Sequence, residues 1–454
     1  MDNLLVQIAH DRDQLLSRDQ LRTTYRTLVA TPTTVLAALT STGEDPLLLL
    51  HPTHSTLAYV AVLNARLSTS PTSNSLLAYA STFARAFDAR QLVVGPQLLI
   101  QFAELAASCA TACHHPQAAI RILMLVCDKL NSTSLDGHSA DGAVHLTPIH
   151  VLLLKHCLLA RNYKAAHQVL LAEITDIASP VAPIRVQDFL LYHYYGGLAY
   201  IGNKDFVAAL QFFEICLCTP SNAPSAIQIE AFKRHVLVSL LLNGAALPLP
   251  KSVAHTVARS CRSQAFYYTE FASAYSSLNS ARALAKASLY SERFAADRTT
   301  GLVHQCLADL IRRKIRKLTD TYLTLSLSDI IKAISLGDSS VTGNADPSNE
   351  AEVHVVRMID SNQILATISH LDGGMVYFHD PLEGLDKLST THSLEDQIST
   401  LFSRDAETRN LDRKIGLSRN YIQRTTQDKP HPQSIHFDDD LGKGINHGKG
   451  DWDA

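Results

Sequence analysis

The spacing of apolar residues predicts two consecutive helices from residue 321 onward. The first covers 321–337, where apolar residues recur every three or four positions: Leu323, Leu327, Ile330, Ile331 and Ile334. A loop rich in Gly, Asn, Asp, Ser and Pro begins at Gly337 and ends this helix. The second helix is expected over 348–364, with one face formed by Val353, Val356 and Ile359 and with Val355 and Met358 beside it.

The period then changes to that of a β-strand. Apolar and polar residues alternate from Ile364 to Ser369, as in a half-buried strand. The sequence Asp372-Gly373-Gly374 is typical of a hairpin turn, because glycine adopts positive φ without steric cost. The returning strand is expected at Met375 to Phe378. Two helices followed by a hairpin predict a winged helix over about 319–380.

Three segments upstream share one pattern, a pair of alanines with a large apolar residue four positions after the second alanine. The pairs are Ala118-Ala119 before Leu123, Ala165-Ala166 before Leu170, and Ala208-Ala209 before Phe213. Small residues let two antiparallel helices approach closely, so the pattern indicates a helix-pair repeat. The third copy, with Gly197 and Tyr200 before it, has tetratricopeptide-like spacing. The copies are farther apart than the ~34 residues of that repeat, so longer turns or irregular helices are expected.

These patterns predict a mostly α-helical chain. N-terminal helical repeats are expected over 1–185, and further repeats from 186 to about 318 lead into the winged helix. A polar amphipathic helix over 390–420 carries a narrow apolar seam, which suits a partner helix better than a full core. The tail over 426–454, rich in His, Asp, Gly, Lys and Pro, is predicted to be disordered. It holds the only tryptophan, Trp452, which is read as part of an inert end.

Composition narrows the class of protein. The formal net charge of −3 over 454 residues argues against wholesale electrostatic binding to nucleic acid. The first residues carry acids where a secretory signal needs basic ones, and the apolar runs are too short to span a membrane. A soluble intracellular protein is therefore expected. The eight cysteines are dispersed among apolar helical residues, as reduced core cysteines are.

The sequence shows no pattern of catalytic or metal-binding residues. Cys109, Cys113, His114 and His115 form the most metal-like cluster, yet no second ligand pair lies at a zinc-finger spacing, so helix packing is the favoured interpretation. A phosphate-binding glycine loop is missing, and no local Ser–His–Asp or Cys–His signature is found. We therefore predict no catalytic residue, no metal and no cofactor.

The winged helix raises the possibility of DNA binding, because its second helix is the recognition helix of many regulators. That helix carries Glu350, Glu352 and Asp360 against Arg357 alone, whereas phosphate contacts need lysine and arginine. A basic run at 312–317 spreads around its helix, so a solvated face or an acidic partner is the better interpretation. Nucleic acid is therefore not an expected partner.

The region from Phe189 to Asp380 resembles the COP9 signalosome subunit 3 family of PCI-domain proteins. The resemblance is carried by FLLYHYYGGLAYIGNKDFVAALQFFEICLCTP from Phe189, EAFKRHVLVSLLLNG from Glu230, GLVHQCLADLIRRKIRKLTDTYLTLSLSDI from Gly301 and ILATISHLDGGMVYFHD from Ile364. It implies that 186–380 is a PCI domain in a non-catalytic scaffold subunit of a nuclear and cytoplasmic complex that deneddylates cullins. In that family a separate metalloprotease subunit performs the hydrolysis. That chemistry needs a His-x-His pair, which this sequence does not contain.

The resemblance further implies assembly with other signalosome subunits, with subunits one and eight as candidate neighbours, and indirect contact with cullin-RING ligases. Two kinds of surface are expected to bind them: the strand edge of the hairpin and the seam of the C-terminal helix. The residues predicted to bind partners are Ile364, Ile368, Met375, Tyr377, Leu394, Ile398, Leu401 and Ile415. Two alternatives remain: a PCI scaffold of the proteasome lid or a translation initiation complex, and an RNA-binding PCI protein.

Overall fold

The computed structural model describes residues 18–40, 43–132, 144–172, 174–177, 183–221, 223–335, 347–370, 374–379, 388–419 and 421–423. The chain divides into two units, residues 1–363 and 364–454. No described helix is both long and apolar enough to cross a membrane. The predicted tail, 426–454, lies outside the described residues.

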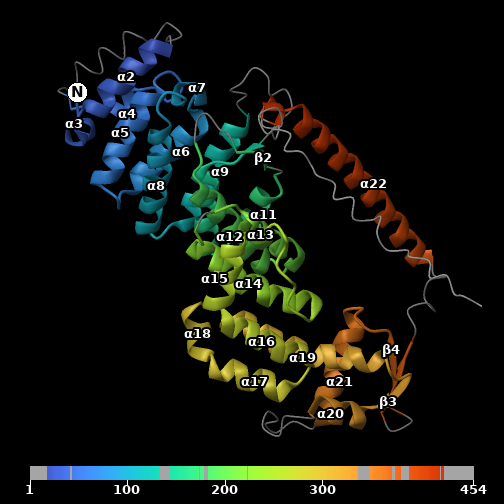
Figure 1. Cartoon of the computed structure of the whole chain (residues 1–454). Helices are drawn as coiled ribbons and strands as arrows, with labels where there is room; N and C mark the ends of the chain where they lie inside the picture. The colour runs from blue at the N-terminus through green and yellow to red at the C-terminus, as the bar shows by residue number, and fades with distance from the viewer. Residues whose placement is uncertain are drawn as a thin grey trace, which may run out of the picture. The chain divides into compact units, whose positions relative to one another are not determined.

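The first unit is a succession of helices that pack against their neighbours in chain order, as α8 to α14 show in Figure 1. This confirms the prediction of a mostly α-helical fold with helical repeats. Its described helices up to residue 319 are α2 (Arg18–Ala30), α3 (Thr33–Ala37), α4 (Pro46–Leu49), α5 (Thr56–Thr69), α6 (Asn74–Ala86), α7 (Ala89–Leu92), α8 (Pro96–Ala112), α9 (Pro116–Ser132), α10 (Pro148–Leu159), α11 (Tyr163–Leu170), α12 (Val186–Gly202), α13 (Phe206–Cys218), α14 (Ala226–Asn243), α15 (His255–Gln264), α16 (Phe266–Ser276), α17 (Ser280–Leu289), α18 (Ser291–Ala296) and α19 (Thr300–Thr319).

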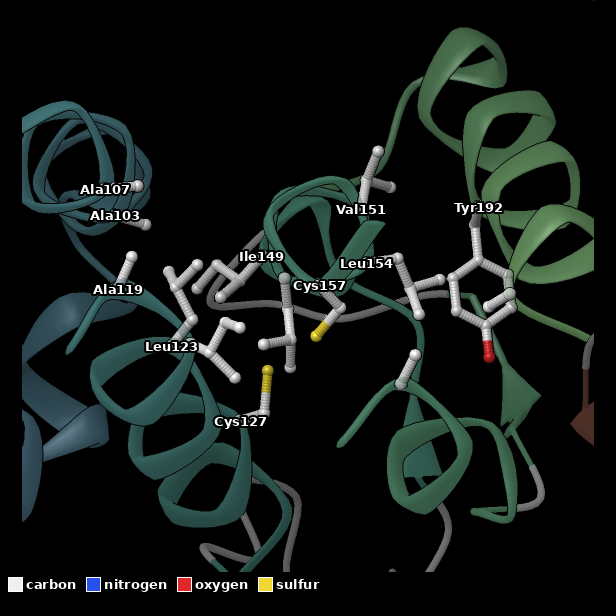
Figure 2. Close-up of a cluster of buried hydrophobic side chains, with 14 of the residues drawn as sticks. Ala103, Ala107, Ala119, Leu123, Cys127, Ile149, Val151, Leu154, Cys157 and Tyr192 are labelled. Carbon is white, nitrogen blue, oxygen red and sulfur yellow. The ribbon is translucent and has the colours of Figure 1, made fainter. Parts of the chain in front are cut away.

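The repeated alanines lie at helix contacts, as the pattern predicts. The second alanine of each pair and the large residue after it are buried: Ala119 and Leu123, Ala166 and Leu170, Ala209 and Phe213. In Figure 2, Ala119 of α9 faces Ala103 and Ala107 of α8. On α12, a Cβ added to Gly197 would lie 2.6 Å from the ring of Phe213 on α13. Small residues thus set how closely these helices pack.

A left-handed turn joins the two helices of several pairs. Between α12 and α13, Lys204 adopts a left-handed conformation with φ of 63°, and the N–H groups of Lys204 and Asp205 donate to the carbonyls of Ile201 and Tyr200, both at 3.0 Å. This is a Schellman motif. Asp205 then caps α13 by accepting from the Ala208 N–H, at 3.1 Å. Left-handed residues end the first helix at other turns too: His114, Arg161, Leu278 and Arg298.

The long period of the repeat comes from the connections between helix pairs. Within a pair the turns are short, since α10 ends at Leu159 and α11 begins at Tyr163. Between pairs the chain runs from Ser132 to Pro148, and again from Leu170 to Val186. Each of these connections contributes one strand, β1 (Val144–His145) and β2 (Ile174–Asp176), and the two pair in parallel. Of the two predicted explanations, longer turns are therefore the right one.

The winged-helix elements follow in the predicted order, but the first helix starts later than predicted. Residues Thr324–Ser326 form strand β3 instead of helix, and Leu323 is 79% exposed instead of lying on an apolar helical face. Helix α20 covers Leu327–Ser335. The Ser326 hydroxyl accepts from the Asp329 N–H at 3.1 Å, so it caps the helix at its true start.

The buried face of the next helix, α21 (Pro347–Asp360), also differs from the predicted one. Ala351, Val355 and Met358 are buried, whereas Val353 and Val356 are exposed. The two faces were hard to distinguish from the sequence because valines occur on both. Alanine at position 351 completes an i, i+4, i+7 row with Val355 and Met358, and this small residue permits close packing of α21.

Buried histidines make the stability of the first unit depend on pH. The Nδ1 atom of His150 on α10 lies 2.8 Å from the Thr147 hydroxyl and accepts from the Thr147 N–H at 3.2 Å. Burial lowers the pKa of His150 from 6.5 to about 4, and the hydrogen bond to Thr147 opposes this only in part. His150 is therefore neutral in the folded protein at neutral pH.

Because the folded pKa lies below the unfolded one, protonation favours the unfolded state. The contribution of His150 is complete above pH 6.5 and is lost as the pH falls towards 4, by about 3 kcal/mol in all. Denaturant unfolding at pH 7.5, 6 and 5 should show this loss. His150→Gln keeps an acceptor but cannot titrate, so its stability should depend less steeply on pH. An equal slope for variant and parent would contradict this account.

Candidate partner-binding surfaces

The second unit contains a helix that buries little of its own surface. Helix α22 spans 30 residues, Leu388–Leu417, and each of its described side chains other than Leu411 is exposed. Its apolar residues Leu394, Ile398 and Leu401 lie four and three positions apart, so they form one row. Ile415 lies two heptads after Leu401. Heptad positions shift slowly around a straight α-helix, so Ile415 continues the row as a left-handed stripe. We call this row the α22 seam.

The α22 seam has the character of a helix-binding surface. Leu401 is 68% exposed, and Leu394, Ile398 and Ile415 are each about half exposed. Helices in proteins owe most of their stability to packing of an apolar face, and the seam side chains keep about half or more of their surface exposed. Polar positions separate its two ends, and there Arg409 pairs with Asp405 at 2.9 Å. A partner helix would bury the seam and leave this ion pair exposed to water.

The hairpin offers a second surface, the backbone of one strand. Strand β4 (Ala366–Ser369) pairs antiparallel with β5 (Met375–Phe378), and β4 lies at the edge of its sheet. The His379 N–H donates to the Leu365 carbonyl at 2.8 Å. Since hydrogen-bonded and non-bonded pairs alternate, the backbone groups of Thr367 and Ser369 point to β5. Those of Ala366 and Ile368 point away from β5, towards an edge on which no described strand pairs with β4. Of the predicted turn, Gly374 has φ of 80°, whereas Asp372 and Gly373 lie outside the described residues.

The four predicted hairpin residues lie on both faces of the hairpin. Ile368 is opposite Val376, so Ile364 and Ile368 share the buried face, and Ile364 is itself buried. Met375 and Tyr377 alternate with Val376 and lie half-buried on the other face. The backbone groups of Ile368 therefore face the strand edge, and its side chain is half-buried. The backbone groups of Met375 and Tyr377 instead form hydrogen bonds with β4.

Part of the basic run of α19, residues 312–317, forms contacts inside the first unit. The Arg313 guanidinium donates to Asp309 at 2.7 Å, to the Tyr275 hydroxyl at 3.1 Å and to the Leu241 carbonyl at 2.6 Å. Leu241 lies in the last turn of α14, so Arg313 satisfies a carbonyl at that helix end. Arg316 and Lys317 remain exposed. The run therefore supplies fewer surface charges than its sequence implies.

An ion-pair network joins α14, α16 and the turn after α18. The sequence pattern did not predict it. Lys233 donates to Glu230 at 2.6 Å and to Asp297 at 2.7 Å, and Tyr267 donates to Asp297 at 2.7 Å. Burial disfavours the charged form of Lys233, but these two carboxylates outweigh it and raise its pKa. The sequence signal was the run Lys233-Arg234-His235 in the middle of a helix rich in apolar residues. Such charges are buried only when paired.

Comparison with known proteins places the chain in a family. A family model for the N-terminal helical repeats of COP9 signalosome complex subunit 3 matches residues 21–257, just over half of the chain. The chain belongs to the COP9 signalosome complex subunit 3 family. A PCI-domain model matches residues 286–380, so this part of the family fold includes the winged helix and ends before α22.

Relatives in the COP9 signalosome complex subunit 3 family match along most of their length. The COP9 signalosome complex subunit 3 of Dictyostelium discoideum is 30% identical over 361 residues, which cover 80% of this chain and 82% of the relative. The Drosophila melanogaster protein of that name is 32% identical over 314 residues, which cover 64% of this chain and 68% of the relative.

Proposed function

We propose that this chain is a non-catalytic scaffold subunit of a COP9 signalosome, the complex that deneddylates cullin-RING ubiquitin ligases. Membership of the subunit 3 family, with helical repeats and a PCI domain in one chain, supports this most. Hydrolysis would belong to a separate metalloprotease subunit. The partners are other signalosome subunits, with subunits one and eight as first candidates, and cullin-RING ligases bind through the assembled complex. Such a complex works in the nucleus and the cytoplasm.

Purification of the tagged chain from its own cells tests this proposal. Mass spectrometry should identify signalosome subunits at equal stoichiometry, and the purified complex should remove the modifier from a neddylated cullin. Recovery of proteasome-lid or translation-factor subunits instead would overturn the assignment. Salt-sensitive recovery of RNA without these subunits would favour the RNA-binding alternative.

The open edge of β4 supports assembly by strand pairing. A strand edge presents unpaired N–H and C=O groups, which are a template for a strand of another subunit. The groups available on β4 are those of Ala366 and Ile368, because the intervening residue Thr367 bonds to β5. This arrangement gives a test that separates binding from folding.

Ala366→Pro is expected to weaken the association with the neighbouring subunit by about tenfold. It removes one outward N–H donor, worth about 1 kcal/mol or more, and places a pyrrolidine ring on the edge. The measurement is the fraction of chain that enters the purified complex at limiting concentration.

Thr367→Pro is the matched comparison. It removes an N–H that bonds inside the hairpin, so it should lower the melting temperature, whereas Ala366→Pro should change the melting temperature little. Normal assembly of the Ala366→Pro chain would show that this edge does not pair with a partner.

A further inference from the structure

A groove of about 610 Å³ lies beside α13 in the first unit, and its lining residues include none of β4 or α22. Phe189 of α12, Ile215 of α13, and Pro220 and Pro250 of the following loops provide its apolar walls. Gln211 and Glu214 add polar groups along α13. Residues 211, 214, 215 and 218 are spaced three and four apart, so one face of α13 forms the side of the groove.

The apolar part of the groove is open to solvent. Ile215 is 43% exposed although it lies in the middle of a packed helix pair. A side chain that filled the space would remove Ile215 and the two prolines from water. Burying one large apolar side chain contributes about 1.5–3 kcal/mol. This is enough for an anchor residue of a docked peptide and not for a stable interface by itself.

The polar part carries a negative charge without a cation. The Glu214 side chain is 33% exposed, and in the described part of the chain its one ion-pair contact is His235 Nε2, at 3.4 Å. His235 is fully buried, and burial lowers its pKa although Glu214 opposes the shift, so it is neutral at neutral pH. Lys251 follows Pro250 in the chain but forms no ion pair with Glu214.

We propose that this groove docks a segment of a partner protein in which a large apolar residue lies beside an arginine or lysine. The apolar residue would lie against Ile215, Pro220 and Pro250. The basic residue would pair with Glu214, with which arginine can form a bidentate bond. Phe189 adds an aromatic ring to the groove lining, on which a cation can pack. This proposal does not depend on strand pairing or on the α22 seam. It can be wrong even if the proposals for those two surfaces are right.

Selection of random twelve-residue peptides displayed on phage, against the purified full chain, tests the proposal. Enriched peptides should share an apolar residue within four positions of an arginine or lysine. Labelled synthetic copies of them should bind at least tenfold more weakly to Ile215→Asp. Glu214→Gln, which changes charge with little change of shape, should also weaken binding. Glu214→Lys should shift the preference of the selection from basic to acidic peptides.

Two controls separate binding from folding. Leu159→Asp places the same charge on an exposed leucine of α10 that is not part of the groove, and it should bind the peptides as the parent does. Each variant should keep the melting temperature of the parent within a few degrees. The proposal is overturned if no peptide is enriched, if the enriched peptides are acidic, or if Ile215→Asp binds them unchanged.

Discussion

Replacing Gly197 with valine should lower the stability of the repeat region by about 3 kcal/mol or more. A Cβ at this position would lie 2.6 Å from Cε1 and 2.7 Å from Cζ of Phe213, which is fully buried. The better helix propensity of valine returns only a few tenths of a kcal/mol. The melting temperature of the full chain should fall by roughly 6 °C or more.

Gly301 provides the matched control for this substitution. It also lies in a helix, in the first turn of α19, but nothing lies within 4 Å of the Cβ that would be added there. Gly301→Val should therefore leave the melting temperature nearly unchanged. If the variants at positions 197 and 301 behaved alike, close packing of α12 on α13 would not be the reason for Gly197.

The helix-pair repeat could be predicted because its packing uses short-range spacing. Ala166 and Leu170, or Ala209 and Phe213, lie one turn apart on the same helix face, so the pattern that builds the contact is visible in the sequence. The αL turns were not predicted, since Arg161 and Lys204 carry no glycine signal. The following Asn162 and Asp205 would have been the usable sign, because both cap the next helix.

Which face of an element is buried was harder to predict than the element itself. Alternation placed Ile364 and Ile368 on one face of the hairpin, but alternation alone does not show which face meets the core. In the structure that face is buried at Ile364, so this side chain is not available at the surface. On α21 the same ambiguity placed Val353 on the predicted apolar face, whereas Val355 is the buried residue.

Contacts between distant positions had no short-range signal that identifies both partners. The groove beside α13 combines Phe189, Ile215 and Pro250, which come from two helices and a loop far apart in the sequence. The salt bridge between Lys233 and Asp297 spans 64 positions. The α22 seam is the opposite case, because its described side chains are exposed and its row follows from local spacing alone.

Three aspartates placed in the α22 seam should abolish entry of the chain into its complex. Leu394, Ile398 and Leu401 are exposed in the free chain, so Leu394→Asp, Ile398→Asp and Leu401→Asp together should leave its folding intact. If a partner helix buries them, each contributes about 1.5–3 kcal/mol, so the triple variant should bind more than about a thousandfold more weakly. The measurement is co-purification of the other subunits with the tagged variant.

The opposite side of the same helix supplies a control with equal added charge. Ser399, Ser403 and Asn410 lie on the far face from the α22 seam and are exposed. Their triple replacement by aspartate should leave assembly at the level of the parent chain. Loss of assembly in both triple variants would indicate a general effect of charge, and normal assembly of the seam variant would show that α22 does not hold the chain in the complex. Ile415→Asp alone should have a smaller effect, because polar positions separate it from Leu401.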